Sequence, residues 1–331
     1  MKTNKFLLIA LAAAGLFTAC SNNNEAVKPN QGNAISFRLQ GGMPAAKTTA
    51  STDANVDAFV VYGNDDKTLT MFNGVTVARQ IVTGAPAGFS YAPTRYYDVT
   101  ATVAAFVAYS PASTVFNAVS AANVLGALST FTYTVPAPVA NGNTSQIDLL
   151  FAVEGSVDPT AGSAVQLDFT HALSRVFVAA KNTTDDPVTI KKLTLKGLCS
   201  QGTITVPAGA ASWSWGGQTN TTTLYEYVLA PTGVIVPGDG ASAAYKLVTS
   251  MEQGMMILPQ DLTAACKLEV VYEFANLATQ TKEFDISSNT SSITEFVENN
   301  QYSINLEFTG TTVRFEIGVD GFDSIEDVDI P

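Results

Sequence analysis

Apolar and polar residues alternate with period two along most of the chain after residue 33. In QYSINLEF, residues 301–308, the apolar side chains Tyr302, Ile304, Leu306 and Phe308 are separated by polar ones. This alternation places the apolar residues on one face of a half-buried β-strand. The same pattern predicts strands over 34–39, 57–62, 75–82, 99–109, 131–135, 147–153, 165–169, 174–180, 188–195, 203–206, 224–229 and 267–274.

These strands predict the fold class. Many short alternating strands separated by turn residues are typical of β-sandwiches and barrels. Only residues 115–128 (VFNAVSAANVLGAL) favour a short helix, and they lack strong caps. A Gly/Pro/Asp/Ser stretch at 155–163 separates two groups of strands. We therefore predict an all-β protein with two β-sandwich domains in tandem, over residues 34–160 and 161–331.

The N-terminus has the features of an export signal. Lys2 and Lys5 precede an apolar run over residues 6–17, which is short for a membrane span. Cys20 follows small residues directly, as in a bacterial lipobox, where the cysteine thiol is acylated. We predict a lipoprotein signal peptide over residues 1–19, although an ordinary signal peptide or a short membrane span would show a similar pattern.

Composition limits the classes of partner. Residues 20–33 are polar and predict a tether between the lipidated cysteine and the folded part. The chain has 331 residues, of which 17 are basic and 29 acidic, giving a net charge of −12. A chain this acidic, without a basic patch, is a poor ligand for nucleic acid or for anionic lipid head groups.

Candidate chemistry is sparse. His171 is the single histidine, and no cysteine or carboxylate lies at metal-ligand spacing around it. We therefore interpret it as a hydrogen-bonded histidine at a strand edge or domain junction, and predict no metal, no cofactor and no enzymatic activity. Beyond the lipobox, Cys199 and Cys266 are compatible with either a disulfide or two buried thiols.

Four aromatic residues form two period-two pairs, Trp213 with Trp215 and Tyr225 with Tyr227. Each pair would lie on one face of a strand. Aromatic platforms bind sugars, but cross-strand aromatic pairs are also ordinary sheet packing. We favour packing and keep glycan binding as the alternative.

Five stretches together resemble the fimbrillin family, the pilins and pilus-associated lipoproteins of Bacteroidales. They are RYYDVTATVAAFVAYSP at 95–111, QIDLLFA at 146–152, VQLDFTHALSRVFVAAKN at 165–182, GMMILPQ at 254–260 and QYSINLEF at 301–308. The resemblance implies two transthyretin-like β-sandwiches exported to the outer membrane as a lipoprotein. It also implies that a trypsin-like protease removes an N-terminal segment with the first strand. The vacated groove then accepts a strand from the next subunit, which builds an adhesive fimbria.

Carried onto this sequence, the resemblance makes 34–39 the displaced first strand, with Ile35, Phe37 and Leu39 on its apolar face. Lys47 stands in the following loop, where the family usually carries an arginine cleavage site. Arg38 is the nearest arginine, although it lies inside the strand. An arginine-specific protease would not cut at Lys47, so the identity of the protease stays open.

The C-terminal residues 311–331 are the candidate donor segment. Val313, Phe315, Ile317 and Val319 alternate with polar or small residues, as a donated strand requires. The same alternation also suits the last strand of the chain's own sandwich. The predicted partners are other copies of this chain or related fimbrial subunits, the outer membrane through Cys20, and a host or bacterial surface ligand. The alternatives are a monomeric glycan-binding lipoprotein and a non-polymerising anchor or tip subunit.

Overall fold

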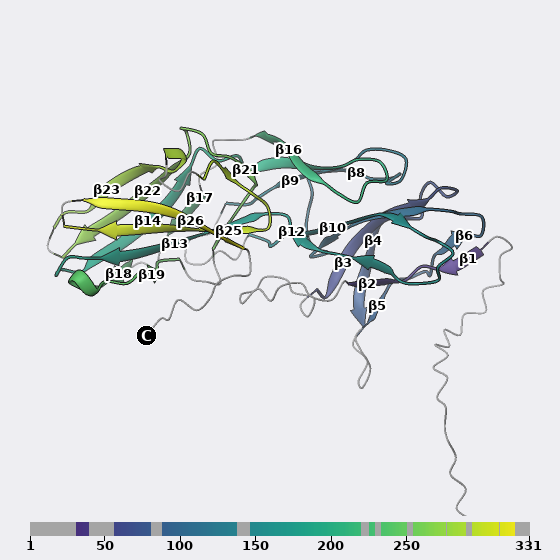
Figure 1. Cartoon of the computed structure of the whole chain (residues 1–331), viewed down its shortest axis with the longest axis horizontal. Helices are drawn as coiled ribbons and strands as arrows, with labels where there is room; N and C mark the ends of the chain where they lie inside the picture. The colour runs from purple at the N-terminus through teal and green to yellow at the C-terminus, as the bar shows by residue number, and fades with distance from the viewer. Residues whose placement is uncertain are drawn as a thin grey trace, which may run out of the picture.

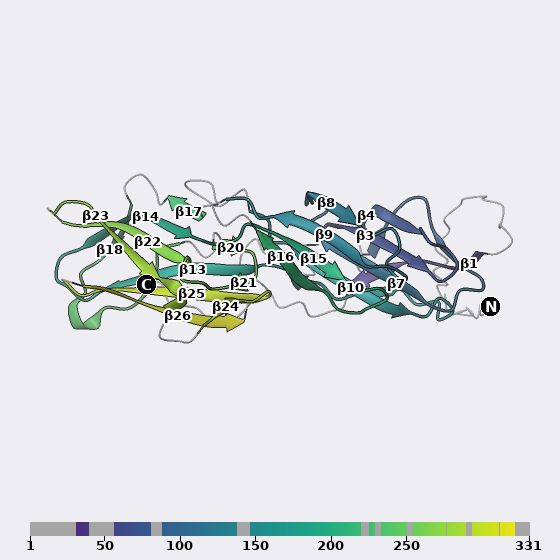
Figure 2. The same ribbon diagram turned by 90° about the horizontal axis from the view of Figure 1, so that it is seen from above.

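A computed structural model describes residues 31–39, 56–80, 88–137, 146–219, 225–228, 233–249, 254–275, 277–288, 293–310 and 312–321. In these residues the secondary structure consists of β-strands and short 3₁₀ helices, η1 (Gly240–Ser242) and η3 (Ile286–Ser288). The prediction of an all-β protein is confirmed. The molecule is elongated, and its N-terminal and C-terminal strands occupy opposite halves (Figures 1 and 2).

The N-terminal half is built on a six-stranded sheet in the order β12-β10-β7-β3-β4-β5. Its strands are β12 (Thr170–His171), β10 (Leu150–Val157), β7 (Ala104–Ser110), β3 (Ala58–Asp65), β4 (Phe72–Gln80) and β5 (Gly88–Ser90). All seven residues of β7 are buried, because this central strand is covered on both faces. Such a strand reads as a continuous apolar run, here AAFVAYS, rather than as an alternation.

Different layers cover the two faces of this sheet. On one face lies a four-stranded sheet of β16 (Ser214–Thr219), β15 (Gln201–Val206), β9 (Ser129–Thr134) and β8 (Ala118–Ser120). Phe131 of β9 packs on Phe151 of β10, with ring centroids 5.2 Å apart. The other face is covered by two short ribbons, β1 (Gln31–Ala34) with β6 (Tyr96–Asp98) and β2 (Phe37–Leu39) with β11 (Val165–Leu167).

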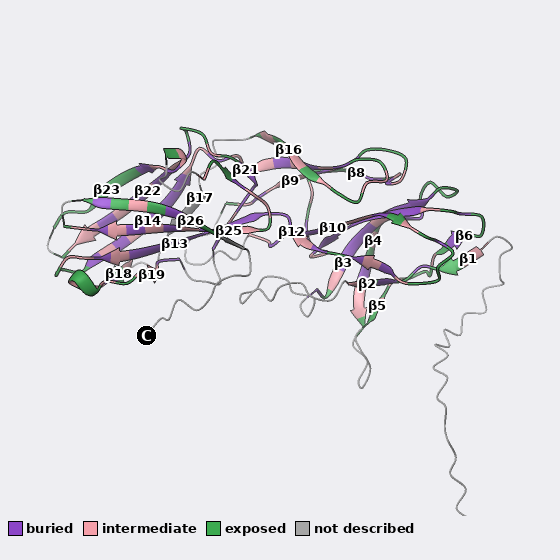
Figure 3. Ribbon diagram, viewed as in Figure 1, coloured by how far each residue is buried: buried purple, intermediate pink, exposed green. Residues whose placement is uncertain are grey.

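The C-terminal half is a sandwich of two five-stranded sheets. One contains β19 (Lys246–Leu247), β13 (Ser174–Asn182), β25 (Asn300–Phe308), β26 (Val313–Gly321) and β20 (Met255–Ile257). The other contains β17 (Tyr225–Val228), β14 (Val188–Lys196), β22 (Lys267–Phe274), β23 (Gln280–Asp285) and β18 (Val234–Val236). Apolar side chains from both sheets meet in one core. Figure 3 shows the buried stretches of these strands in purple. A short ribbon of β21 (Gln260–Asp261) and β24 (Glu295–Phe296) lies beside this sandwich.

The expected helix over 115–128 is wrong. Ala118–Ser120 forms β8 instead, and pairs with β9 through Ala118 opposite Thr132 and Ser120 opposite Thr130. The segment has no strong cap to begin a helix, whereas the edge of β9 offers a complete set of backbone partners.

The division into domains at residue 160 stays a prediction. Strand pairing crosses that point, since β11 pairs with β2, β12 pairs with β10, and β15 pairs with β9. Residues 165–171 and 201–219 thus add to sheets that are built from residues before 160.

Candidate acceptor groove beneath the N-terminal segment

Residues 31–39 lie between two walls of the N-terminal half. β1 pairs antiparallel with β6, with Ala34 opposite Tyr96. β2 pairs parallel with β11, with Phe37 opposite Val165. One short segment therefore takes its backbone partners from two strands that are about 70 residues apart in the sequence.

Backbone and side-chain hydrogen bonds fix the middle of this segment. The Ile35 N–H donates to the Arg95 carbonyl oxygen at 2.9 Å, and the Val165 N–H donates to the Ser36 carbonyl oxygen at 2.8 Å. The Tyr91 hydroxyl donates to the Ile35 carbonyl oxygen at 2.7 Å. If the segment left, each of these groups would lose a partner, and unpaired buried backbone groups are costly.

The floor of the groove is aromatic. Phe37 is 5% exposed and sits at the centre of four rings. Its ring centroid lies 6.0 Å from that of Phe59, 5.4 Å from Phe72, 5.9 Å from Tyr91 and 5.6 Å from Phe106, all in edge-to-face geometry. Ile35 is also buried, and Leu39 packs against the same cluster. The apolar face expected for Ile35, Phe37 and Leu39 is thus the face that the segment turns toward the core.

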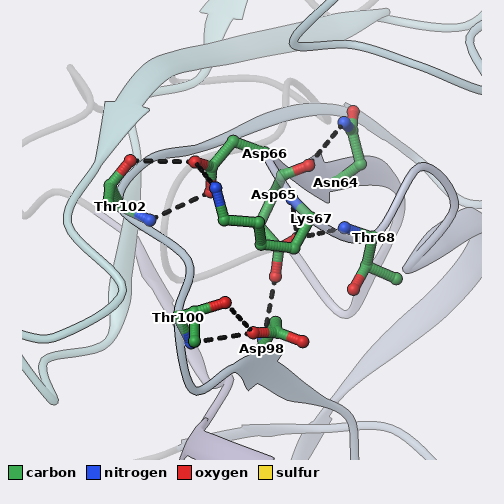
Figure 4. Close-up of polar contacts among 8 residues, drawn as sticks. All are labelled: Asn64, Asp65, Asp66, Lys67, Thr68, Asp98, Thr100 and Thr102. Atoms are coloured by element: carbon green, nitrogen blue, oxygen red, sulfur yellow. Dashed lines mark hydrogen bonds and ion pairs between the residues drawn. The ribbon is translucent and has the colours of Figure 1, made fainter.

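The β6 wall is held by a polar network that does not involve residues 31–39 (Figure 4). The Asp98 N–H donates to Asp65 Oδ2 at 3.0 Å, and Thr102 donates its N–H and its hydroxyl to the Asp66 carboxylate, both at 2.9 Å. The hydroxyl and N–H of Thr100 hydrogen-bond to the Asp98 carboxylate and lower its pKa. These contacts tie the β3–β4 turn to both ends of the β6–β7 loop, so the wall has its own support.

Of the two candidate cleavage positions, Lys47 and Arg38, the structure describes only Arg38. Lys47 and the lipidation candidate Cys20 lie outside the described residues. Arg38 lies within β2, is exposed, and donates from Nη2 to Gln166 Oε1 at 2.8 Å. A protease pairs with the backbone of its substrate, and the backbone of Arg38 is paired with β11. Cutting at Arg38 therefore requires β2 to separate from β11 first.

The predicted donor residues form β26, which pairs antiparallel with β25 over its whole length, from Val313 opposite Phe308 to Gly321 opposite Asn300. In the isolated chain, β26 therefore completes its own sheet and is the outermost strand. Val313 and Ile317 are buried, and Phe315 packs on Phe284 with ring centroids 5.1 Å apart. Val319 is 50% exposed, and residues 322–331 lie outside the described part.

Trp213 and Trp215 pack against the core and are not fully exposed to solvent. Both residues are half-buried against the main core. The Trp213 ring contacts Phe151 at 5.4 Å between centroids, and Trp215 Nε1 donates to the Ala172 carbonyl oxygen at 2.6 Å. The packing interpretation of the tryptophans is supported, while the side chains of Tyr225 and Tyr227 lie outside the description.

His171 is buried on the edge strand β12, and its Nδ1 lies 2.8 Å from Asp148 Oδ1. This confirms the interpretation of a hydrogen-bonded histidine at a strand edge. Cys199 and Cys266 are both thiols. Burial raises the pKa of the Cys199 thiol.

The described residues contain neither a metal-binding cluster nor a membrane-spanning helix. No group of three or more histidine, cysteine, aspartate or glutamate side chains there is placed to hold a metal ion. No helix there has the length and apolar character needed to cross a bilayer.

Sequence periodicity identifies only one wall of the groove. The strand predicted over 165–169 contains β11, whereas Tyr91, Arg95 and β6 lie outside every alternating segment. The available signal is the stretch RYYD at 95–98, which carries part of the family resemblance and contains β6.

Comparisons with known proteins agree with this architecture. The sequence profile described as fimbrillin-like matches residues 45–320. A solved fimbrial protein of Bacteroides vulgatus is similar at a TM-score of 0.59 and 14% identity, over 88% of this chain and 99% of that one. A candidate cell adhesion protein of Bacteroides uniformis is similar at a TM-score of 0.55 and 20% identity, over 87% and 98%. No curated protein matches the sequence.

Proposed function

Because the chain belongs to the fimbrillin-like family, we propose that it is a structural subunit of a surface fimbria that polymerises by strand exchange and serves cell adhesion. The family match confirms the resemblance carried by the sequence motifs. The proposal rests on one observation: residues 31–39 fill an aromatic groove between β6 and β11 as a separate short segment.

In this proposal, the chain is exported with a signal peptide over residues 1–19 and is anchored in the outer membrane through acylated Cys20. A protease then cuts after Lys47, with Arg38 as the alternative. Cleavage separates residues 31–39 covalently from the rest of the chain, so that only non-covalent contacts retain them. The two halves of the chain act as tandem transthyretin-like sandwiches, divided near residue 160.

A strand from another copy then takes the place of residues 31–39. Val313, Phe315, Ile317 and Val319 of β26 are the proposed donor residues, and β26 is an outer strand with one edge unpaired in its sheet. In the groove, four apolar side chains at roughly 1.5–3 kcal/mol each would supply on the order of 6–12 kcal/mol relative to exposed side chains. The ordering costs, and the burial that Val313 and Ile317 already have in their own sheet, must be subtracted from this gain. The new strand would also restore the backbone hydrogen bonds of β6 and β11.

The glycan-binding alternative loses its main support, because Trp213 and Trp215 are both half-buried against the core and do not form one exposed platform together. A non-polymerising anchor or tip subunit would share the fold and differ in keeping its lipid. Resistance to cleavage at Lys47 would identify that role.

Limited trypsin digestion tests the proposal. The chain from Ser21 onward is digested under native conditions, beside a version that ends at Gly310. We expect cleavage after Lys47, found by N-terminal sequencing, to give a ladder of multimers on a gel run without boiling. The version ending at Gly310 should give no ladder.

A full-length chain that is trimmed cleanly at Lys47 and stays monomeric would contradict strand donation. Together with unfolding of the version ending at Gly310, which circular dichroism would detect, it would mean that β26 only completes its own sheet. Unfolding of the truncated version alone would make its missing ladder uninformative about donation. A folded, monomeric truncated form beside a polymerising full-length form is the required contrast.

A further inference from the structure

A cavity of about 560 Å³ lies between β16 and the β21–β24 ribbon. β16 and β21 lie where the N-terminal and C-terminal halves meet (Figure 1). Trp215 and Gln218 line it from β16, and Asp261 and Glu295 line it from the ribbon. Its volume falls in the range of sites that hold a small ligand or an anchoring side chain. The proposed strand exchange makes no use of this cavity.

The cavity has a rigid aromatic wall. Trp215 cannot rotate freely, because its Nε1 donates to the Ala172 carbonyl oxygen at 2.6 Å. The indole lies against the backbone of Gly202, where an added Cβ would come within 3.1 Å of the ring. The glycine thus allows the indole to lie close to strand β15, and the wall exists before any ligand arrives.

The floor is also preformed. The Gln260 side chain is 8% exposed, and it binds the backbone of Cys199 in both directions. The Cys199 N–H donates to Gln260 Oε1 at 2.6 Å, and Gln260 Nε2 donates to the Cys199 carbonyl oxygen at 3.0 Å. A ligand would therefore meet a fixed shape, which lowers the ordering cost of binding.

The lining carries uncompensated negative charge. Asp261, Glu295 and Glu298 line the cavity, and among the described residues none of them forms an ion pair or a side-chain hydrogen bond. Several carboxylates elsewhere in the C-terminal half are paired, such as Glu273 with Lys191 at 2.8 Å and Asp285 with Lys267 at 2.9 Å. The cavity thus combines an indole ring with carboxylates that have no cationic partner among the described residues.

We propose that this cavity binds an arginine side chain of a partner protein. A guanidinium ion is planar, stacks on an indole face, and donates two parallel hydrogen bonds to a carboxylate. A lysine ammonium ion offers charge without the planar fork, and a neutral sugar would leave the negative charge uncompensated. The charge complementarity favours a basic polypeptide over either.

Tryptophan fluorescence tests the assignment, because the chain contains two tryptophans. In the chain from Ser21 onward, Trp213→Phe leaves Trp215 as the single indole. We expect the peptide acetyl-Gly-Arg-Gly-amide to change its fluorescence saturably, with an affinity that falls as salt is added. The citrulline peptide, which has the same shape without the charge, should bind at least tenfold more weakly. Calorimetry on the chain with both tryptophans should give the same affinity.

Variants locate the site. The double variant Asp261→Asn, Glu295→Gln should bind the arginine peptide at least tenfold more weakly. Glu283→Gln is the matched control, because Glu283 is 48% exposed and pairs with Lys196 outside the cavity. It should leave the affinity unchanged, and circular dichroism should find both variants folded. Binding of the citrulline peptide, or of acetyl-Gly-Lys-Gly-amide, as tight as that of the arginine peptide would overturn the proposal. So would an unchanged affinity of the double variant, or the lack of a saturable signal.

Discussion

The side chain of Phe37 anchors the N-terminal segment in the aromatic groove. Its four ring neighbours come from separate parts of the N-terminal half: Phe59 on β3, Phe72 on β4, Phe106 on β7, and Tyr91 just after β5. Edge-to-face pairs add attraction beyond the burial of area. A pocket formed by these rings favours an aromatic occupant, and Phe315 is the aromatic residue of the proposed donor strand.

Truncating Phe37 should therefore be costly in the uncut chain. We expect Phe37→Ala to lower the free energy of unfolding by about 3–5 kcal/mol, because the change removes a buried ring and leaves a cavity. Leu69→Ala, at a side chain that is 68% exposed, should change it by less than about 0.5 kcal/mol. Urea denaturation of the two variants gives the comparison. Equal losses would mean that Phe37 does not anchor the segment.

At the scale of elements, β2 and β26 are held very differently. β2 has three residues paired with β11, while β26 has nine residues paired with β25. A strand paired over three residues separates from its neighbour more easily than a strand paired over nine, because fewer hydrogen bonds must break together. The N-terminal segment is accordingly the element suited to displacement, and donation of β26 requires a larger gain elsewhere.

Two substitutions in β26 separate its roles. Ile317→Ala should lower the free energy of unfolding of the monomer by about 2–5 kcal/mol, because Ile317 is buried in its own sandwich. Val319→Asp should change it by less than about 0.5 kcal/mol, since this side chain is 50% exposed. If β26 is donated, Val319→Asp should still abolish the trypsin-induced ladder, because a charge would enter the groove unpaired. A normal ladder from Val319→Asp would exclude this position from the donor.

At the scale of the whole molecule, the groove and the proposed donor lie in opposite halves. Figure 1 places β1, β2 and β6 in the N-terminal half and β26 in the C-terminal half, and Figure 2 shows the same separation of β1 from β26. An exchange between these sites joins one molecule to the next, head to tail. A head-to-tail contact that does not close on itself generates a filament.

Anchoring and release can be followed in cells. With radiolabelled palmitate, the chain with Cys20 intact should carry label in the membrane fraction, and Cys20→Ser should carry none. Lys47→Gln should keep the label on the full-length chain, because a trypsin-like protease needs a basic residue at the cut. Loss of label from Lys47→Gln would point to Arg38 instead, and Lys47→Arg is the control that should be processed normally.

The alternation of apolar and polar residues by itself determined that the chain is made of β-strands. KLEVVYEF became β22 with the expected bounds, and QYSINLEF became β25 with one added residue. Alternation is a local property that follows from the pleat of a strand, so it survives without knowledge of its partners. The family resemblance likewise rested on short stretches of sequence. Alternation also put Ile35 and Phe37 on one apolar face, and both side chains are buried, although the expected strand over 34–39 is interrupted and Ile35 lies between β1 and β2.

Tertiary structure alone decided which strands are neighbours. β15 joins β9 and β11 joins β2 across the expected boundary at residue 160, because pairing depends on backbone groups that every sequence carries. It also turned Ala118–Ser120 into a strand, since the edge of β9 was available to it. Tyr91, Arg95 and the Trp215 cavity likewise follow from packing between distant segments, which no local pattern encodes.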